Sequence, residues 1–332
     1  MTTIVGGIEM QLPLILGAGV AKHPNQVFPY LYPDAPLGAA LSGSYTIESR
    51  EGNNGVLMWP DDLGGLLQNG FGLNAWGMPN LGLAKAMKLF PQNPAKPHLV
   101  SIAGFKASDY IEMLEILKGN KQIAGVELNG GCPNTGHLPV AYMLDDLEQL
   151  LEAVSNIGFD LPIWLKLSPY MTGWDMKDFS DKYNNMNFQN TPVVEDDFVE
   201  KLCELLTEYQ HALSAVVMTN TLPNVILGES ITVRNTDGSV HHKGGLSGPV
   251  LLEHNLKLID QMVNTGITAD IDIIGCGGIM TGDDALAYLQ AGCTGVQCTS
   301  GPAWSNAKFF QQLIEGSEGL QEYLFSTQGA TQ

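Results

Sequence analysis

The sequence has few cysteines and few basic residues, and both shortages narrow what the protein can be. Five cysteines are spread over 332 residues, and no two stand at C-x-x-C spacing. This argues against a disulfide framework and a structural zinc site, so we expect no metal and a reducing compartment. Lys and Arg number 16 against 35 Asp and Glu, which gives a net charge of -19. Such an acidic chain would be repelled by nucleic acid and by anionic membranes.

The N-terminal segment lacks both a basic region and an uninterrupted hydrophobic run. Gly17, Gly19 and Lys22 break its apolar stretch before it is long enough to cross a bilayer. We therefore expect a cytoplasmic protein without a membrane anchor.

Apolar runs that end in Gly, Asn or Ser recur along the chain and predict buried strands. Helical periodicity fills many of the intervals, as in segments 142–157 and 196–213, where acidic pairs at 145–146 and 196–197 suit helix starts. The pattern predicts an α/β fold, a (β/α)8 TIM barrel formed by residues 1–332 as one domain. The alternative is a doubly wound open sheet, but no early G-x-G-x-x-G turn opens a helix. The predicted strands lie in LPLILGAG, LGAALSGS, HLVSIAG, GVELNGG, PIWLKLS, AVVMTN, DIIGCGG and GVQCTSG.

The segment 230–245 interrupts this alternation. Two β-like runs flank an Asp-Gly pair at 237–238, which predicts a small β-hairpin inserted into a strand-to-helix loop.

Four asparagines stand at predicted strand ends: Asn74, Asn129, Asn134 and Asn220. Each carboxamide offers a donor and an acceptor, so a converging set would suit a pyrimidine or another cyclic imide with alternating C=O and N–H groups. The alternative for any one of them is that it holds a loop in a turn conformation.

Two glycine-rich turns follow the last two predicted strands and place Gly277, Gly278, Ser300 and Gly301 there. TIM barrels commonly hold a phosphate at this position with backbone N–H groups, so we expect a phosphorylated ligand. Lys166 alternates with apolar neighbours inside a strand, so its ammonium should enter the barrel mouth and meet an anion or an electron-rich ring. The alternative is a lysine that reaches back to solvent.

Cys132 lies in a glycine-rich loop, and its surroundings leave its role open among a buried filler, a nucleophile and a general base. A papain-like nucleophile is disfavoured because no histidine stands closer than His137.

Together these stretches resemble the dihydroorotate dehydrogenases. The family pattern E-L-N-x-S-C-P-N is matched by ELNGGCPN, and further matches follow in order over nearly the whole chain: LILGAGV, REGN, NAWGMPNLG, WLKLSPY, TNT, GGLSG and IIGCGGIMTGDDALAYLQAGCTGVQ. The resemblance implies a barrel with FMN across its top, where dihydroorotate loses a proton from C5 to a base and a hydride from C6 to the flavin. A second substrate would then reoxidise the flavin.

The family's functional residues can be carried onto this chain position by position. The resemblance implies that Cys132 is the base, and a cysteine there is similar to the soluble class 1 enzymes, whose homodimeric branch uses fumarate as the acceptor. It implies substrate contacts from Asn74, Gly77, Met78, Asn129, Asn134, Asn220 and Thr221, and FMN contacts from Gly17, Ala18, Gly19, Ser44, Lys166, Gly245, Gly277, Gly278, Ser300 and Gly301.

Two departures from the family pattern bear on the substrate. Gly43 stands where soluble members have a lysine beside flavin and substrate, and Lys22, Lys106 and Lys243 lie in strand-end loops that could supply a replacement charge. The loop PNTGHLP after Cys132 is also altered. Two alternatives therefore stay open: a related FMN oxidoreductase acting on another dihydropyrimidine or cyclic enamide, and a flavin-binding protein that has lost turnover.

Overall fold

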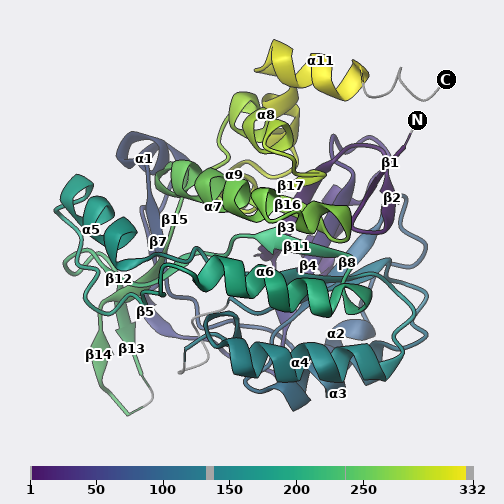
Figure 1. Ribbon diagram of the computed structural model, residues 1–332, viewed down its shortest axis with the longest axis horizontal. Coiled ribbons are helices and arrows are strands. Elements are labelled where there is room, and N and C mark those ends of the chain that lie inside the picture. Colours follow the sequence, from purple (N-terminus) through teal and green to yellow (C-terminus); the bar gives the residue numbers. More distant parts are fainter. Residues whose placement is uncertain (1, 132–137, 236, 327–332) are drawn as a thin grey trace.

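The structure, a computed structural model, describes residues 2–131, 138–235 and 237–326. Eight parallel strands close into a barrel in which each strand pairs with the next along the chain and the last pairs with the first (Figure 1). The eight predicted strands are confirmed, and the open-sheet alternative is wrong. The barrel strands are β3 (Leu14–Ala21), β4 (Ala39–Tyr45), β8 (His98–Ile102), β9 (Gly125–Asn129), β10 (Ile163–Lys166), β11 (Ala215–Met218), β16 (Asp272–Cys276) and β17 (Gly295–Cys298).

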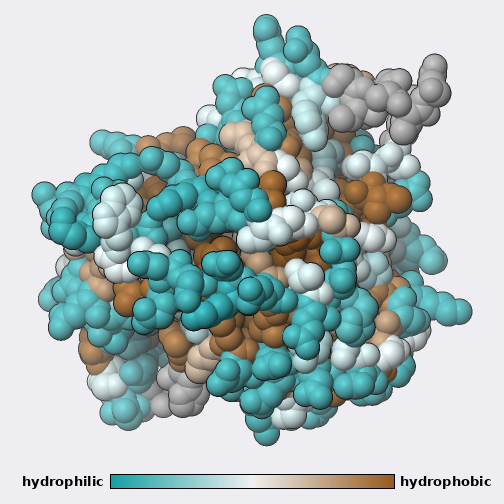
Figure 2. All heavy atoms as spheres, viewed as in Figure 1, coloured by the Kyte–Doolittle hydropathy of each residue, from teal (hydrophilic) through white to brown (hydrophobic). Residues whose placement is uncertain are grey.

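Amphipathic helices follow most of the barrel strands and cover them from outside (Figure 1). Polar side chains dominate the outward surfaces of these helices on the face that Figure 2 shows, and apolar ones appear mainly in the seams between them. The helices are α1 (Leu63–Asn69), α2 (Leu83–Met87), α3 (Ala107–Leu117), α4 (Leu144–Ile157), α5 (Gly173–Lys182), α6 (Phe198–Glu208), α7 (Leu252–Asn264), α8 (Gly282–Gln290), α9 (Ser300–Ser305), α10 (Lys308–Glu315) and α11 (Glu318–Ser326).

Local sequence explains where these helices begin and end. Asp145 and Asp146 occupy the first turn of α4, and Asp197 is the N-cap residue of α6, as the acidic pairs predict. At α8, the Thr281 hydroxyl accepts from the backbone N–H of Asp284, whose carboxylate accepts in return from the Thr281 N–H. Within the described ranges, no helix is both long and apolar enough to span a membrane.

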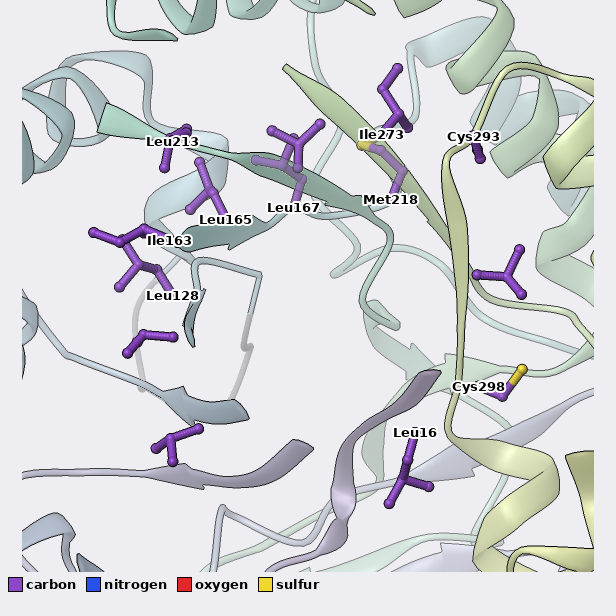
Figure 3. Close-up of a cluster of buried hydrophobic side chains, with 14 of the residues drawn as sticks. Leu16, Leu128, Ile163, Leu165, Leu167, Leu213, Met218, Ile273, Cys293 and Cys298 are labelled. Atoms are coloured by element: carbon purple, nitrogen blue, oxygen red, sulfur yellow. The ribbon is translucent and has the colours of Figure 1, made fainter. Parts of the chain in front are cut away.

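Strand side chains alternate between two cores. Those that point outward pack beneath the helices, among them Leu16, Leu128, Leu165 and Cys298, which Figure 3 shows around the barrel. Those that point inward fill the barrel, and the largest is Trp164. Because the period of a strand is two residues, Lys166 has the same inward orientation as Trp164.

An N-terminal hairpin closes the amino end of the barrel. Its strands are β1 (Thr3–Val5) and β2 (Ile8–Met10). The indole N–H of Trp164 donates to the Gly6 carbonyl at 2.8 Å, and Val5 packs into the same interior cluster. The hairpin therefore packs against the amino end of the barrel interior.

Two small antiparallel sheets are added at that carboxyl end. The predicted hairpin is confirmed, because Val233 pairs with His241 between β11 and α7. The insertion is larger than predicted, however, since it recruits segments from earlier in the chain. One sheet has the order β12 (Leu222–Ile226), β15 (Lys243–Ser247), β7 (Gly72–Asn74) and β6 (Met58–Trp59), and the other has the order β14 (Val240–His241), β13 (Thr232–Arg234) and β5 (Asn54–Val56).

Candidate active site

A pocket lies at the carboxyl end of the barrel, between the strand ends and the sheet that contains β7 and β15. TIM-barrel active sites occupy this end because the strand-to-helix loops converge there. Most of the predicted site residues meet in this pocket: Ala18, Gly19, Ser44, Asn74, Met78, Asn129, Lys166, Asn220, Thr221, Gly277, Gly278 and Ser300.

The other predicted residues divide into two groups. Gly17, Gly77, Gly245 and Gly301 do not line the pocket. A side chain at any of these four would collide with a neighbour, for example with Thr299 at Gly17 and Phe309 at Gly301, so close packing accounts for their glycines. Cys132 and Asn134 lie outside the described residues.

Two of the predicted asparagines are joined directly. The Asn220 carboxamide nitrogen donates to Asn129 Oδ1 at 2.8 Å, and Asn220 Oδ1 accepts from the backbone N–H of Thr221 at 2.8 Å. Asn74 reaches the pocket from a different place than predicted. It ends β7 of the added sheet rather than a barrel strand, and its side chain donates to the Gly245 carbonyl at 3.4 Å.

Lys166 enters the barrel mouth as predicted. Its side chain is buried and lines the pocket, and Nζ donates to Gln297 Oε1 at 2.6 Å. Burial alone would lower the pKa of Lys166, but Cys276 and Glu127 outweigh that effect and leave the pKa above its usual value. Burial also raises the pKa of the Cys276 thiol. Glu127 is the acidic side chain that is linked to Lys166, through hydrogen bonds to Gln297.

Lys22 is the second cation at the pocket. Its Nζ lies 3.7 Å from the centroid of the Trp76 ring, and both side chains line the pocket. Burial lowers the pKa of Lys22 to about 8. Of the three candidate lysines, Lys22 lines the pocket, and Lys106 and Lys243 do not.

Gly43 cannot be exchanged for the family's lysine on this backbone. Its φ of +111° is one that side chains rarely adopt, and an added Cβ would lie 2.5 Å from the carbonyl oxygen of Ser101. Position 43 therefore favours glycine, and a lysine side chain is not accommodated there without a change in the backbone.

The electrostatics of the pocket oppose those of the whole chain. The chain has 35 Asp and Glu, yet none of the described residues that line the pocket is acidic. Lys22, Lys166 and the amides of Asn74, Asn129 and Asn220 line it instead. This combination suits a ligand that carries a carboxylate and carbonyl oxygens. No group of His, Cys, Asp and Glu within the described ranges could hold a metal ion.

The turns after β16 and β17 fit a phosphorylated cofactor. Gly277 and Gly278 have φ values of +112° and +78°, and a Cβ at Gly278 would lie 2.7 Å from the backbone nitrogen of Leu252. Ser300 lines the pocket beside them at the start of α9. The residues present therefore fit FMN: small turns at the phosphate end, and Lys166 with amide groups deeper in the barrel.

Several residues at or beneath the pocket were not predicted as site residues. Trp76 lines it, and Ser101, Glu127 and Gln297 are fully buried in the barrel interior. Glu127 and Gln297 carry a sequence signal similar to that of Lys166, a polar residue at an inward position of a mostly apolar strand.

Comparisons with known proteins agree with this geometry. The sequence model of the family described as dihydroorotate dehydrogenase matches residues 1–202 and 191–322. The catalytic subunit of dihydroorotate dehydrogenase B (NAD(+)) from Cutibacterium acnes is 27% identical over 297 residues, which cover 87% of this chain and 83% of that protein. Dihydroorotate dehydrogenase A (fumarate) from Lactococcus lactis subsp. lactis is 28% identical over 295 residues, or 86% and 83%.

A solved structure supports the fold. The crystal structure of a DHODH from Eimeria tenella in complex with ferulenol matches with a TM-score of 0.72, at 17% identity, over 99% of this chain and 85% of that one.

Proposed function

Because the chain belongs to the dihydroorotate dehydrogenase family, we propose that it uses FMN to oxidise dihydroorotate to orotate in pyrimidine biosynthesis. The observation that carries this proposal is the absence of acidic side chains among the described pocket residues, together with two lysines and three asparagines that line the pocket. Dihydroorotate is an anionic cyclic imide, and this set of donors matches its carboxylate and its carbonyl oxygens.

We propose that Lys22 supplies the positive charge that the family's lysine would supply at position 43. Lys22 reaches the pocket from the end of β3, whereas position 43, where the family has its lysine, lies within β4. Its ammonium pairs with the substrate carboxylate, and the Trp76 ring holds it in place. A charged hydrogen bond of this kind contributes about 1.5–3 kcal/mol.

The remaining roles follow the site. Asn74, Asn129, Asn134 and Asn220 orient the ring, and Cys132 removes the proton from C5. FMN, when bound, would supply the acceptor for the hydride that leaves C6. Lys166 holds a positive charge inside the barrel at the flavin, where it stabilises negative charge that develops during the reaction.

We further propose fumarate as the second substrate. The relatives include fumarate-dependent and NAD(+)-dependent enzymes at nearly the same identity, so similarity alone does not choose between them. A small dicarboxylate can use the same lysine-lined pocket, whereas the NAD(+)-dependent relative is named as one subunit of a larger enzyme. A homodimer, a cytoplasmic location and a single FMN-binding domain over residues 1–332 complete the proposal.

A substrate panel tests the proposal. FMN-loaded protein should oxidise dihydroorotate with fumarate as acceptor and show little activity with dihydrouracil, which lacks the carboxylate that Lys22 would bind. Preference for dihydrouracil would favour the related dihydropyrimidine oxidoreductase. Binding of FMN without turnover of any such substrate would favour the flavin-binding protein.

A further inference from the structure

Glu127 is a buried carboxylate in the barrel interior beneath the pocket. It lies on β9 two residues before Asn129, so both side chains point into the barrel. Glu127 is 0% exposed and does not line the pocket. A buried charge is costly unless it is fully hydrogen-bonded, and the proposed reaction gives this carboxylate no direct role.

One carboxylate oxygen of Glu127 leads to Lys166. The Gln297 carboxamide nitrogen donates to Glu127 Oε2 at 2.8 Å. Gln297 Oε1 accepts from Lys166 Nζ at 2.6 Å. The amide of Gln297 therefore links an ammonium group, which can only donate, to the carboxylate.

The other oxygen leads to Asn129. The Ser101 hydroxyl donates to Glu127 Oε1 at 2.9 Å, and its oxygen lies 2.9 Å from the Ser44 hydroxyl. Since the only Ser101 proton goes to Glu127, Ser44 must be the donor in the second contact. The Asn129 carboxamide nitrogen then donates to Ser44 Oγ at 2.8 Å.

The same chain continues to a backbone group. Asn129 Oδ1 accepts from Asn220, and Asn220 Oδ1 accepts from the Thr221 N–H, each at 2.8 Å. A backbone N–H can only donate. The whole network thus has a donor at both ends, Lys166 and Thr221, and every bond in it runs toward Glu127.

Such a network needs one group that accepts from both sides. Each serine and each carboxamide in this network accepts a hydrogen bond on one side and donates one on the other. In this network the Glu127 carboxylate is the group that accepts on both sides, through Oε1 from Ser101 and through Oε2 from Gln297. We propose that Glu127 is a positioning residue whose carboxylate fixes the direction of both hydrogen-bond chains, and so decides where Lys166 is held and which amide atoms Asn129 and Asn220 present to the ligands.

The direction of the network determines which N–H groups of Asn129 and Asn220 can contact the substrate. Each carboxamide nitrogen has two N–H groups, and Asn129 and Asn220 each use one within the network. The second N–H of each is then directed at acceptors of the ligand, which in dihydroorotate are its oxygens. The identity of that ligand rests on the proposed function, whereas the direction of the network does not.

Glu127→Gln keeps the size of the side chain but replaces one of the two oxygens that accept hydrogen bonds with a donating nitrogen. With its oxygen toward Ser101, the new amide nitrogen faces the nitrogen of Gln297. If Gln297 is rotated so that its oxygen faces the new amide, its nitrogen faces Lys166 Nζ, and two donors meet there instead. Rotating the new glutamine instead turns its amide nitrogen toward Ser101, which must then accept where it now donates, so the hydrogen bonds of Ser101 and Ser44 have to rearrange.

Exchanging the side chains at positions 127 and 297 restores a network in which every contact joins a donor to an acceptor. In Glu127→Gln/Gln297→Glu, the carboxylate at 297 accepts from Lys166 on one side and from the amide nitrogen at 127 on the other. The amide oxygen at 127 then accepts from Ser101. The single change Gln297→Glu places two carboxylates face to face, so it should be impaired like Glu127→Gln.

The experiment is a double-mutant cycle on the full chain, with two readouts. FMN affinity is measured by reconstituting each apoprotein, and orotate affinity is measured on each FMN-loaded protein from the change in flavin absorbance. We expect each single variant to lose orotate affinity by about ten- to a hundredfold and also to bind FMN more weakly. The exchanged double variant should return to within about threefold of wild type. Glu112→Gln, which removes a surface charge from α3, should change neither affinity.

The outcomes separate the two proposals. Single variants with unchanged affinities, or a double variant no better than the singles, would overturn the role of Glu127. If a single variant fails to fold, recovery of a folded, ligand-binding double variant supports the inference, and failure of both variants overturns it. A wild-type protein that binds FMN but not orotate would count against the proposed substrate alone, since the FMN series still tests the network.

Discussion

Replacement of Lys22 tests how the pocket recognises a carboxylate. Lys22→Met keeps a chain of similar length over Trp76 but removes the charge that lies 3.7 Å from that ring. The lost interaction is a charged hydrogen bond to the ligand, worth about 1.5–3 kcal/mol. Orotate should therefore bind about 10- to 150-fold more weakly. The matched control is Lys106→Met, because Lys106 also follows a barrel strand but does not line the pocket.

The pKa of Lys22 predicts that orotate affinity also depends on pH. Burial lowers this pKa to about 8. The protonated form binds the anion, so orotate affinity should be greatest below pH 8 and should fall as the pH rises above it. One unit above its pKa the free lysine is charged in only about 10% of molecules, which weakens binding by up to about tenfold.

Lys22→Arg isolates this titration from others in the pocket. Arginine stays charged throughout the accessible range, so the decline above pH 8 should disappear in this variant. The assay is orotate titration followed by flavin absorbance between pH 6 and pH 10, a range that brackets the pKa of about 8. An affinity of Lys22→Met within about twofold of wild type, or an unchanged pH profile in Lys22→Arg, would refute the assignment of Lys22.

Two further predictions concern Cys132 and Gly43. Cys132→Ser should slow reduction of the flavin by dihydroorotate while FMN stays bound, because a serine hydroxyl is far less often deprotonated at neutral pH than a thiol. Stopped-flow absorbance measures the rate, and an unchanged rate would remove Cys132 from the reaction. Gly43→Ala should lower stability by about 1–3 kcal/mol, since φ is +111° and the new methyl group would lie 2.5 Å from the Ser101 carbonyl oxygen. Thermal unfolding measures it, and an unchanged midpoint would show that the backbone relaxes freely.

The barrel could be predicted from sequence because buried parallel strands leave a strong pattern. Each strand is a short apolar run that ends at a glycine, asparagine or serine, and the loops after those ends converge on one face. The predicted hairpin at 230–245 was correct for the same reason, since an Asp-Gly turn is a strong local signal. The sheet formed by β12, β15, β7 and β6 was not predicted, because it joins segments far apart in the chain and Met58–Trp59 is only two residues long.

The site could be predicted only where a residue type suggested its own chemistry. Asn129, Asn220 and Lys166 were predicted because a carboxamide or an ammonium group at a strand end suggests a ligand, and all three line the pocket. Choosing Lys22 over two other lysines required the path of the loops. The role of Glu127 required the direction of every hydrogen bond around it, which no pattern of residues in the chain contains.

Anaerobic mixing of the FMN-loaded protein with dihydroorotate tests the central claim most directly. The account predicts that the flavin absorbance bleaches in a single turnover and that added fumarate restores it. A flavin spectrum that dihydroorotate leaves unchanged, in protein that binds FMN fully, would contradict it.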